Sequence, residues 1–100
     1  MNQLRLVAAI SERDVLRYTP AGIPIVSAVL LHTSDQVEAG ITRRIDLEIT
    51  AIAAGEISGR FNRVELGQTL NFTGFLARKR RHSKSLVFHI TDFEAYSPDH

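Results

Sequence analysis

The chain of 100 residues has no cysteine, no tryptophan and only three prolines. Without cysteine it can form no disulfide and offers no thiolate to a metal ion, which fits a reducing compartment. No apolar run approaches the roughly 20 residues that a membrane-spanning helix needs. The N-terminal residues show no charged segment followed by a long apolar core, as a secretory signal would. We therefore expect a soluble, cytoplasmic protein that does not contact a membrane.

Motifs of catalysis and cofactor binding are also missing. The sequence has no phosphate-binding glycine loop, no nucleophile elbow and no zinc motif. Its four histidines stand far apart, without a second ligand at a chelating spacing. Asp46 and Glu48 lie on one face of an expected strand, but no third partner accompanies this carboxylate pair. The sequence predicts a binding protein that is not an enzyme and that needs no metal and no cofactor.

Length and charge narrow the class of protein further. One hundred residues correspond to one domain, and a hydrophobic share of 44% is typical of a folded chain. A chain of this size holds one modest core, with little room for a deep active-site cleft. The formal net charge is only +1, but five of the twelve lysines and arginines fall within residues 78–84. The positive charge is therefore concentrated in one segment.

Alternation of apolar and polar residues predicts β-strands in five segments. The expected strands cover residues 3–12, 25–32, 41–51, 69–79 and 84–95. Between them we expect a loop at 33–40, a short helical turn near 52–59, a tight turn at 66–68 and a C-terminal tail at 97–100. Pro20 followed by Ala21 and Gly22 favours a type II turn between the first two strands.

The phenylalanines and the first strand indicate where apolar surface is buried. We expect most of the phenylalanines in the core or in an interface: Phe61, Phe72, Phe88 and Phe93. In the first strand, Val7 and Ala9 leave the outer face apolar as well. This face needs cover, and a 100-residue barrel has a small core of its own, so we expect a homodimer.

A cationic stretch lies between the last two expected strands. It contains Arg78, Lys79, Arg80, Arg81, His82 and Lys84. Like charges at this density repel one another, so the segment is stabilised when a polyanion neutralises it. A row of cations can follow phosphates at variable spacing, which gives affinity without sequence readout. We predict a β-hairpin whose basic tip binds nucleic acid.

This order of elements matches an all-β architecture, the five-stranded Greek-key barrel called the OB-fold. Its helix lies between the third and fourth strands, and its loops between strands one and two and between strands four and five bind single strands. The two segments of unusual chemistry here, residues 13–24 and 78–84, fall in those two loops. On strand count alone, an SH3-like barrel is the alternative.

Three stretches of the sequence carry a family resemblance. They are Tyr18-Thr19-Pro20-Ala21-Gly22-Ile23-Pro24, Glu38-Ala39-Gly40 and Gly74-Phe75-Leu76. With the strand at 25–32 and the chain length, they resemble the family of primosomal replication protein N, PriB. The chain also ends at His100 without the glycine-rich, acidic-tipped tail of the bacterial single-stranded-DNA-binding proteins. The resemblance implies a homodimer of OB-folds that binds single-stranded DNA and works with the restart helicase PriA and the loader protein DnaT.

The resemblance also assigns roles to single residues. The family's basic position just before the proline turn matches Arg17. Its lysines in the loop between strands four and five match Arg80 and Lys84, with His82 where another lysine would stand. The remaining cations of the stretch are additional charge: Arg78, Lys79 and Arg81.

Departures from the family concern the residues that stack on bases. Some members carry a phenylalanine and a tryptophan around the third strand, where this chain has Ile41 and, approximately, Asp46. Affinity should therefore depend more on charge. Tyr18 is a candidate for base stacking, with packing against Pro20 as the alternative. Phe75 is a second candidate, with a place in the core or in an interface as the alternative.

Arg43 and Arg44 begin the third expected strand and are candidates for continuing the binding surface. Two functions remain open at this point. The first is a single-stranded-DNA-binding accessory protein of replication restart. The alternative is a small RNA-binding or ribosome-associated barrel that uses the same basic hairpin, because phosphates do not distinguish DNA from RNA.

Overall fold

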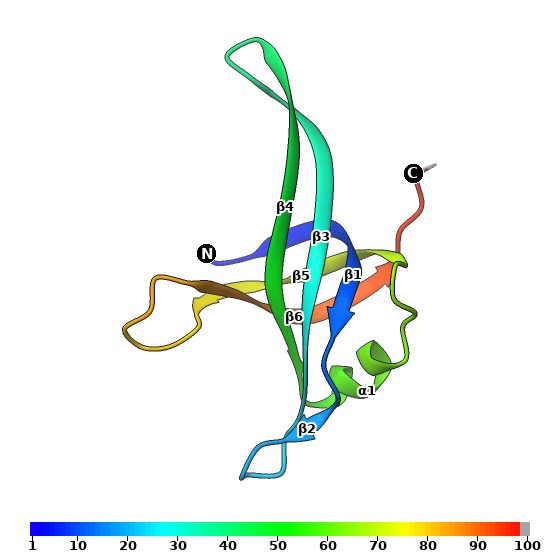
Figure 1. Cartoon of the computed structure of the whole chain (residues 1–100), viewed down its shortest axis with the longest axis vertical. Helices are drawn as coiled ribbons and strands as arrows, with labels where there is room; N and C mark the ends of the chain where they lie inside the picture. The colour runs from blue at the N-terminus through cyan, green and yellow to red at the C-terminus, as the bar shows by residue number, and fades with distance from the viewer. Residues whose placement is uncertain (99–100) are drawn as a thin grey trace.

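The computed structural model describes residues 1–98, and its long strands close into a barrel (Figure 1). The elements are β1 (Leu4–Arg13), β2 (Arg17–Tyr18), β3 (Pro24–Glu38), β4 (Ile41–Ala54), α1 (Glu56–Asn62), β5 (Thr69–Arg78) and β6 (Leu86–Ala95). Their order in the sheet is β1-β5-β6-β4-β3-β2, and a β1–β3 pairing closes it. The β4–β6 pair is parallel and the others are antiparallel. The predicted all-β OB-fold is confirmed, with α1 between the third and fourth barrel strands.

Alternating residues of the barrel strands form the core. The buried set is Ala8, Ile10, Val26, Ala28, Leu30, Ala51, Ala53, Leu70, Phe72, Phe88 and Ile90. Phe61 of α1 is fully buried and closes one end of the barrel, since its ring lies edge-on to Phe72 at 6.2 Å and to Phe93 at 5.9 Å between centroids. The expected places of the four phenylalanines are confirmed, with Phe93 partly buried against the core.

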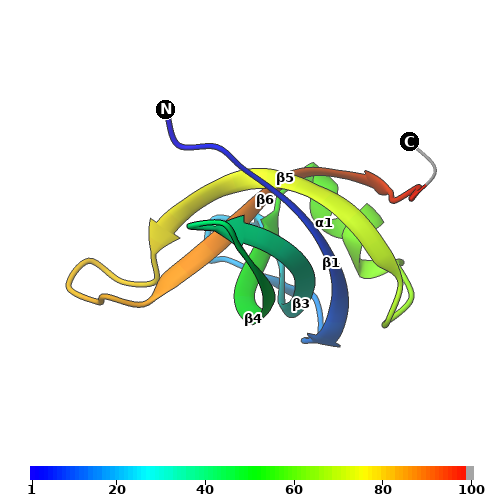
Figure 2. The ribbon, with the colours of Figure 1, turned by 90° about the horizontal axis from the view of Figure 1, so that it is seen from above.

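Gly74 allows β5 to pass very close to β6. A β-bulge interrupts the β5–β6 register between Thr73 and Gly74. A Cβ atom at Gly74 would lie 1.9 Å from the carbonyl oxygen of His89 and 2.7 Å from a ring carbon of Phe88. Only glycine fits here without a shift of the backbone. Figure 2 shows β5 curving around the barrel and continuing, paired with β6, into the hairpin that carries the basic segment.

The loop expected at 33–40 is wrong for residues 33–38, which are strand, and only Ala39 and Gly40 form a turn. β3 continues to Glu38 and β4 begins at Ile41, and the two form a long arm (residues 31–48) that projects beyond the barrel in Figure 1. The turn at its tip has φ = 54° at Ala39 and 76° at Gly40, as in a type I′ turn. The polar sequence resembled a loop because both faces of the arm meet solvent.

Other boundaries also differ from the prediction. β4 extends to Ala54 because Ala51 and Ala53 are buried in the barrel, so the helix begins at Glu56 and not near residue 52. β6 begins at Leu86, two residues later than expected. The tight turn expected at 66–68 is present, with φ = 86° at Gly67 and a hydrogen bond from Gln68 N to Glu65 O.

The predicted type II turn is also wrong. A turn of that type requires a positive φ at Ala21, but the positive φ, 84°, is at Gly22. Gly22 N donates to Thr19 O at 2.8 Å and Thr19 N donates to Ile23 O at 2.9 Å. This is the pattern of a three-residue hairpin loop with glycine in the left-handed region. The hairpin pairs the two-residue strand β2, which the sequence did not predict, with β3.

The last two residues of the expected C-terminal tail, 99–100, lie outside the described residues. Within residues 1–98, no helix has the length and apolar character needed to cross a bilayer.

Candidate nucleic-acid interface

A groove of about 260 Å³ crosses the outer surface of β4 and β6. Its cationic lining is Arg17, Arg78, Lys79 and Arg80. Its floor includes Ser27, Thr50, Ile52, Val87 and His89. The two loops that sequence chemistry singled out thus meet at one surface, although Arg17 and Arg78 are 61 positions apart. A concave surface with cations from two segments attracts an anionic chain more strongly than either segment alone.

The position of Arg17 follows from the β2–β3 hairpin. Arg17 pairs with Ile25 in the register of β2 and β3. Its Nη1 atom donates a hydrogen bond of 3.1 Å to Ser27 Oγ, two residues further along β3. Tyr18 follows in β2, with 68% of its surface exposed, but it does not line the groove. The structure therefore brings Arg17 to the basic segment and leaves Tyr18 beside it, available to solvent.

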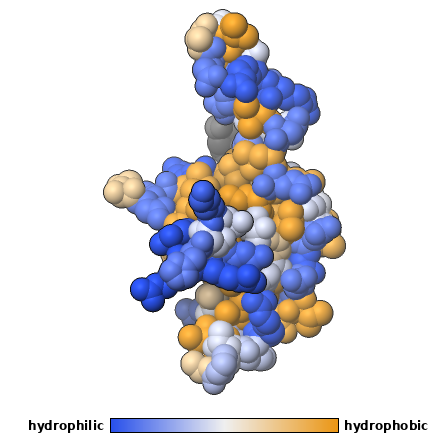
Figure 3. All heavy atoms as spheres, turned by 60° about the vertical axis from the view of Figure 1, so that its left-hand side comes forward, coloured by the Kyte–Doolittle hydropathy of each residue, from blue (hydrophilic) through white to orange (hydrophobic). Residues whose placement is uncertain are grey.

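The basic loop (residues 78–84) joins β5 to β6. Lys79 N donates to Ser85 O at 2.8 Å, and Ser83 N donates to Arg80 O at 3.1 Å, so the backbone of the loop is folded on itself. The remaining basic side chains at the tip are exposed: Arg81, His82 and Lys84. Figure 3 shows hydrophilic side chains gathered over this projecting region. Within residues 1–98, none of the ion pairs involves a side chain of the basic loop.

Arg43 and Arg44 lie elsewhere, on the arm. Arg43 pairs with Glu38 at 2.6 Å, and Arg44 pairs with Asp46 at 3.3 Å. Each arginine is thus partly neutralised by a carboxylate of the same arm. Figure 1 shows the arm and the basic loop leaving the barrel in different directions. The structure does not bring these two arginines together with the groove.

The carboxyl group of Asp46 is held in a defined hydrogen-bonding environment. The hydroxyl of Thr33 donates to Asp46 Oδ1 at 2.8 Å, and this bond is the main cause of a lowered pKa of Asp46. The nearby Arg44 guanidinium lowers the pKa of this carboxyl further. Asp46 is exposed to solvent, and these contacts organise the arm.

Phe75 is the remaining predicted residue. It is 39% exposed, on the outer face of β5, and its ring stacks on His89 with 4.8 Å between centroids and 4° between planes. It touches the groove through His89 and is not itself part of the lining. Sequence reasoning missed the six other lining residues: Ser27, Thr50, Ala51, Ile52, Val87 and His89. The pairing of β4 with β6 brings Ile52 and His89 together, and no local pattern predicts a parallel pairing.

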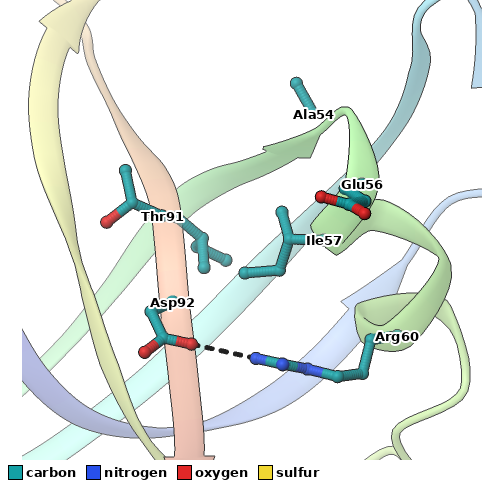
Figure 4. Close-up of a pocket in the computed structure, with 7 residues that line it drawn as sticks. Ala54, Glu56, Ile57, Arg60, Thr91 and Asp92 are labelled. Carbon is teal, nitrogen blue, oxygen red and sulfur yellow. Dashed lines mark hydrogen bonds and ion pairs between the residues drawn. The ribbon is translucent and has the colours of Figure 1, made fainter.

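A larger groove, of about 580 Å³, lies between α1 and β6 (Figure 4). Its arginine, Arg60, forms an ion pair with Asp92 at 2.9 Å and stands 4.5 Å above the ring of Phe93. Glu56 adds a further negative charge to the lining. This groove therefore attracts phosphate much less than the first one, despite its greater volume. Residues 1–98 hold no group of three histidine, aspartate or glutamate side chains that could bind a metal ion.

Comparisons with known proteins agree with this geometry. A family model described as "Another single-strand binding protein family" matches residues 2–92. The replication restart protein PriB of Nitrosomonas europaea is 43% identical over 91 residues, which are 91% of this chain and 84% of that protein. PriB of Bordetella pertussis is 39% identical over 90 residues, 90% of this chain and 84% of the relative.

Solved structures give the same result. PriB from Ralstonia solanacearum superposes with a TM-score of 0.89 at 42% identity, covering 97% of this chain and 99% of that chain. The single-stranded DNA binding protein from Thermus aquaticus, at 19% identity, superposes with a TM-score of 0.76 over 98% of this chain and 51% of that chain, which shows a shared fold. The barrel and the family match place the chain in the class of single-strand binding proteins with an OB-fold. Within that class it belongs to the PriB family of replication restart proteins.

Proposed function

We propose that this protein binds single-stranded DNA in replication restart, through the groove and the basic loop, without catalysing a reaction. The observation that carries the proposal is the meeting of Arg17 with Arg78, Lys79 and Arg80 around one groove. Phosphates lying along it release their condensed counterions, which gives affinity for any sequence. The exposed cations at the tip, Arg81 and Lys84, extend the contact beyond the groove.

A salt titration tests this proposal directly. We would measure the affinity for a fluorescent dT oligomer between low and high salt, for the wild type and for a variant with Arg78, Lys79, Arg80 and Arg81 all changed to Ala. The logarithm of the binding constant should fall with the logarithm of salt by about 0.7 per neutralised phosphate. The variant should lose most of its affinity and most of this slope, while its melting temperature stays unchanged. Unchanged binding at low salt would contradict the proposal.

The Arg63→Ala variant is a suitable control for this experiment. Arg63 is an exposed cation that follows α1, outside the groove, and it has no ion-pair partner among the described residues. Its loss changes net charge without changing the proposed site, so affinity and slope should stay near those of the wild type. RNA and duplex DNA of equal length complete the set. Equal or tighter binding to RNA would favour the alternative RNA-binding function.

We also propose that the protein acts as an adaptor for the restart helicase PriA and for DnaT. Family membership supports this role, and the exposed tip of the basic loop gives a surface that DNA and a protein partner could share. If they share it, dT oligomer should displace the protein from immobilised PriA. Formation of a stable ternary complex with all components at saturation would show separate surfaces instead.

The second copy in the proposed homodimer would lie on the outer face of β1. Val7 and Ala9 are partly buried there and Leu31 is exposed, and these three apolar side chains line a groove of about 260 Å³. Ala9 pairs directly with Leu31 across β1 and β3, so the strip is continuous. Leu31→Arg should convert a dimer to a monomer in sedimentation at micromolar concentration. A wild-type monomer under the same conditions would contradict the proposal.

A further inference from the structure

The stacked pair of Phe75 and His89 connects the hairpin to the groove. The two residues are register partners on β5 and β6, and their rings are almost parallel, with 4° between planes. Stacking of this kind fixes the orientation of both side chains, since each ring limits the rotation of the other. The imidazole of His89 is therefore held in one direction on the outer face of the barrel.

One face of this imidazole is covered and the other borders the groove. His89 lines the groove, whereas Phe75 does not, so Phe75 covers the side of the ring that faces away from it. On the other side, the register partner of His89 is Ile52 on β4, whose own partner is Ser27 on β3. Ile52 and Ser27 both line the groove. A row of side chains thus runs across four strands, from Phe75 to Ser27, where Arg17 is hydrogen-bonded.

We propose that His89 contacts a nucleobase, which stacks on the imidazole face that borders the groove, and that Phe75 positions this ring. The inference deepens the proposed function and rests on it, because it names the base contact of the same binding site. Flat π-systems of bases stack on such rings with little dependence on sequence. The phosphates on either side of that base would reach Arg17 and the cations at the root of the basic loop, which line the same groove.

The proposal explains how a chain with few aromatic residues still holds bases. Ile41 and Asp46 stand on the arm, which leaves the barrel away from the groove. Phe75 and His89 instead supply a preformed two-ring stack at the edge of the groove, with His89 in the lining and Phe75 behind it. A preformed stack binds a base with less loss of side-chain freedom than a mobile aromatic side chain does.

A comparison of oligomers with and without bases separates the contribution of base stacking to affinity from the contribution of charge. We would compare a dT oligomer with an abasic oligomer of equal length, which keeps the phosphates, for the wild type and for His89→Ala. The variant should bind dT between about 5-fold and about 150-fold more weakly, the range for one lost stacked base. It should bind the abasic oligomer as the wild type does. The slope of affinity against salt should be unchanged, because no phosphate contact is lost.

Three further variants complete the test. His89→Phe keeps a ring and should restore most of the dT affinity. Phe75→Leu should weaken dT binding and leave abasic binding unchanged, and Phe75→Tyr should behave as the wild type. His82→Ala is the matched control, since His82 is exposed at the tip of the basic loop and does not line the groove. It should leave the ratio of dT to abasic affinity unchanged.

The outcomes distinguish this inference from the proposed function. If His89→Ala loses the same affinity for both oligomers, or loses no affinity for dT, the base contact is overturned. The proposed single-strand site would remain intact in either case. Binding of the wild type to neither oligomer would instead contradict the proposed function. Melting temperatures identify any variant whose fold is impaired. If His89→Ala is unstable, His89→Phe, which retains a ring, still tests the base contact.

Discussion

Arg17 and Ser27 are joined by a hydrogen bond of 3.1 Å from the guanidinium Nη1 to the serine hydroxyl oxygen. The bond links the short strand β2 to the second long strand of the barrel. It keeps a flexible cationic side chain at the groove, where Arg78, Lys79 and Arg80 form the other cationic part of the lining. Preorganisation of this kind reduces the entropy that the side chain loses when it binds a phosphate.

The first prediction concerns this arginine. Arg17→Ala should lower the affinity for single-stranded DNA and reduce the salt slope by about 0.7, the value for one phosphate contact. Ser27→Ala keeps the charge and removes only its anchor, so it should lower affinity less and leave the slope unchanged. Fluorescence anisotropy over a range of salt concentrations measures both quantities. A slope that stays the same in Arg17→Ala would show that Arg17 does not touch a phosphate.

The second prediction concerns the close approach at Gly74. Gly74→Ala places a methyl group 1.9 Å from the carbonyl oxygen of His89, so strand β5 or β6 must shift. We expect a loss of unfolding free energy of about 3 kcal/mol or more, at the upper end of overpacking effects. Urea unfolding followed by circular dichroism measures it.

Gly59 is the matched control for that substitution. A Cβ atom at this position in α1 would meet only the end of the Arg63 side chain, at 3.8 Å. Gly59→Ala should therefore stabilise the protein, by roughly 0.5–1 kcal/mol, because alanine is the better helix former. Similar effects of the two substitutions would show that the close approach of β5 and β6 is not tight.

The third prediction concerns the tip of the arm. Ala39 has φ = 54°. This left-handed region costs an L-residue such as alanine roughly 1–2 kcal/mol, whereas glycine and, less often, asparagine adopt it routinely. Ala39→Asn should recover about 1 kcal/mol in the local stability of the arm, since Asn-Gly is the preferred pair for a type I′ turn. Amide hydrogen exchange in residues 33–46 should slow. Gly40→Ala, at φ = 76°, should have the opposite effect, and faster exchange in Ala39→Asn would contradict the turn assignment.

The fourth prediction concerns pH. The Thr33 hydroxyl and then Arg44 lower the pKa of Asp46 below its ordinary value of 3.8. A carboxyl with a lowered folded-state pKa contributes stability that is present above the unfolded pKa and is lost as the pH falls through the folded pKa. The arm should therefore weaken only in acid, below about pH 3.8.

Substitution of Thr33 tests the cause of that shift. Thr33→Val removes the donor and should raise the pKa of Asp46 toward its ordinary value, as followed by NMR titration of the carboxyl carbon. Thr33→Ser keeps a hydroxyl and should retain the low pKa. If both variants titrate alike, the hydroxyl is not the main cause.

Local chemistry was readable from the sequence, and long-range pairing was not. The cations at 78–84 and the alternation in the flanking strands gave the basic hairpin, because both depend on neighbouring residues. The arm was missed because Thr33 to Glu38 are polar apart from Val37 and show no apolar alternation, and Ala39-Gly40 lacks the asparagine that usually marks such a turn. From the sequence alone, His89 is only a histidine without a metal partner. Its place in the groove depends on its pairing with Ile52, which lies 37 positions earlier.

The pairing of Ile52 with His89 also joins the site to the parallel junction of the barrel. The parallel ladder between β4 and β6 has three register pairs, from Ala51 with Phe88 to Ala53 with Ile90. A DNA strand bound in the groove would touch both sides of this junction and would hold it shut. Ligand binding would then raise the free energy of opening there more than at the arm. Proteolysis and hydrogen exchange at this junction should thus report occupancy of the site as well as folding.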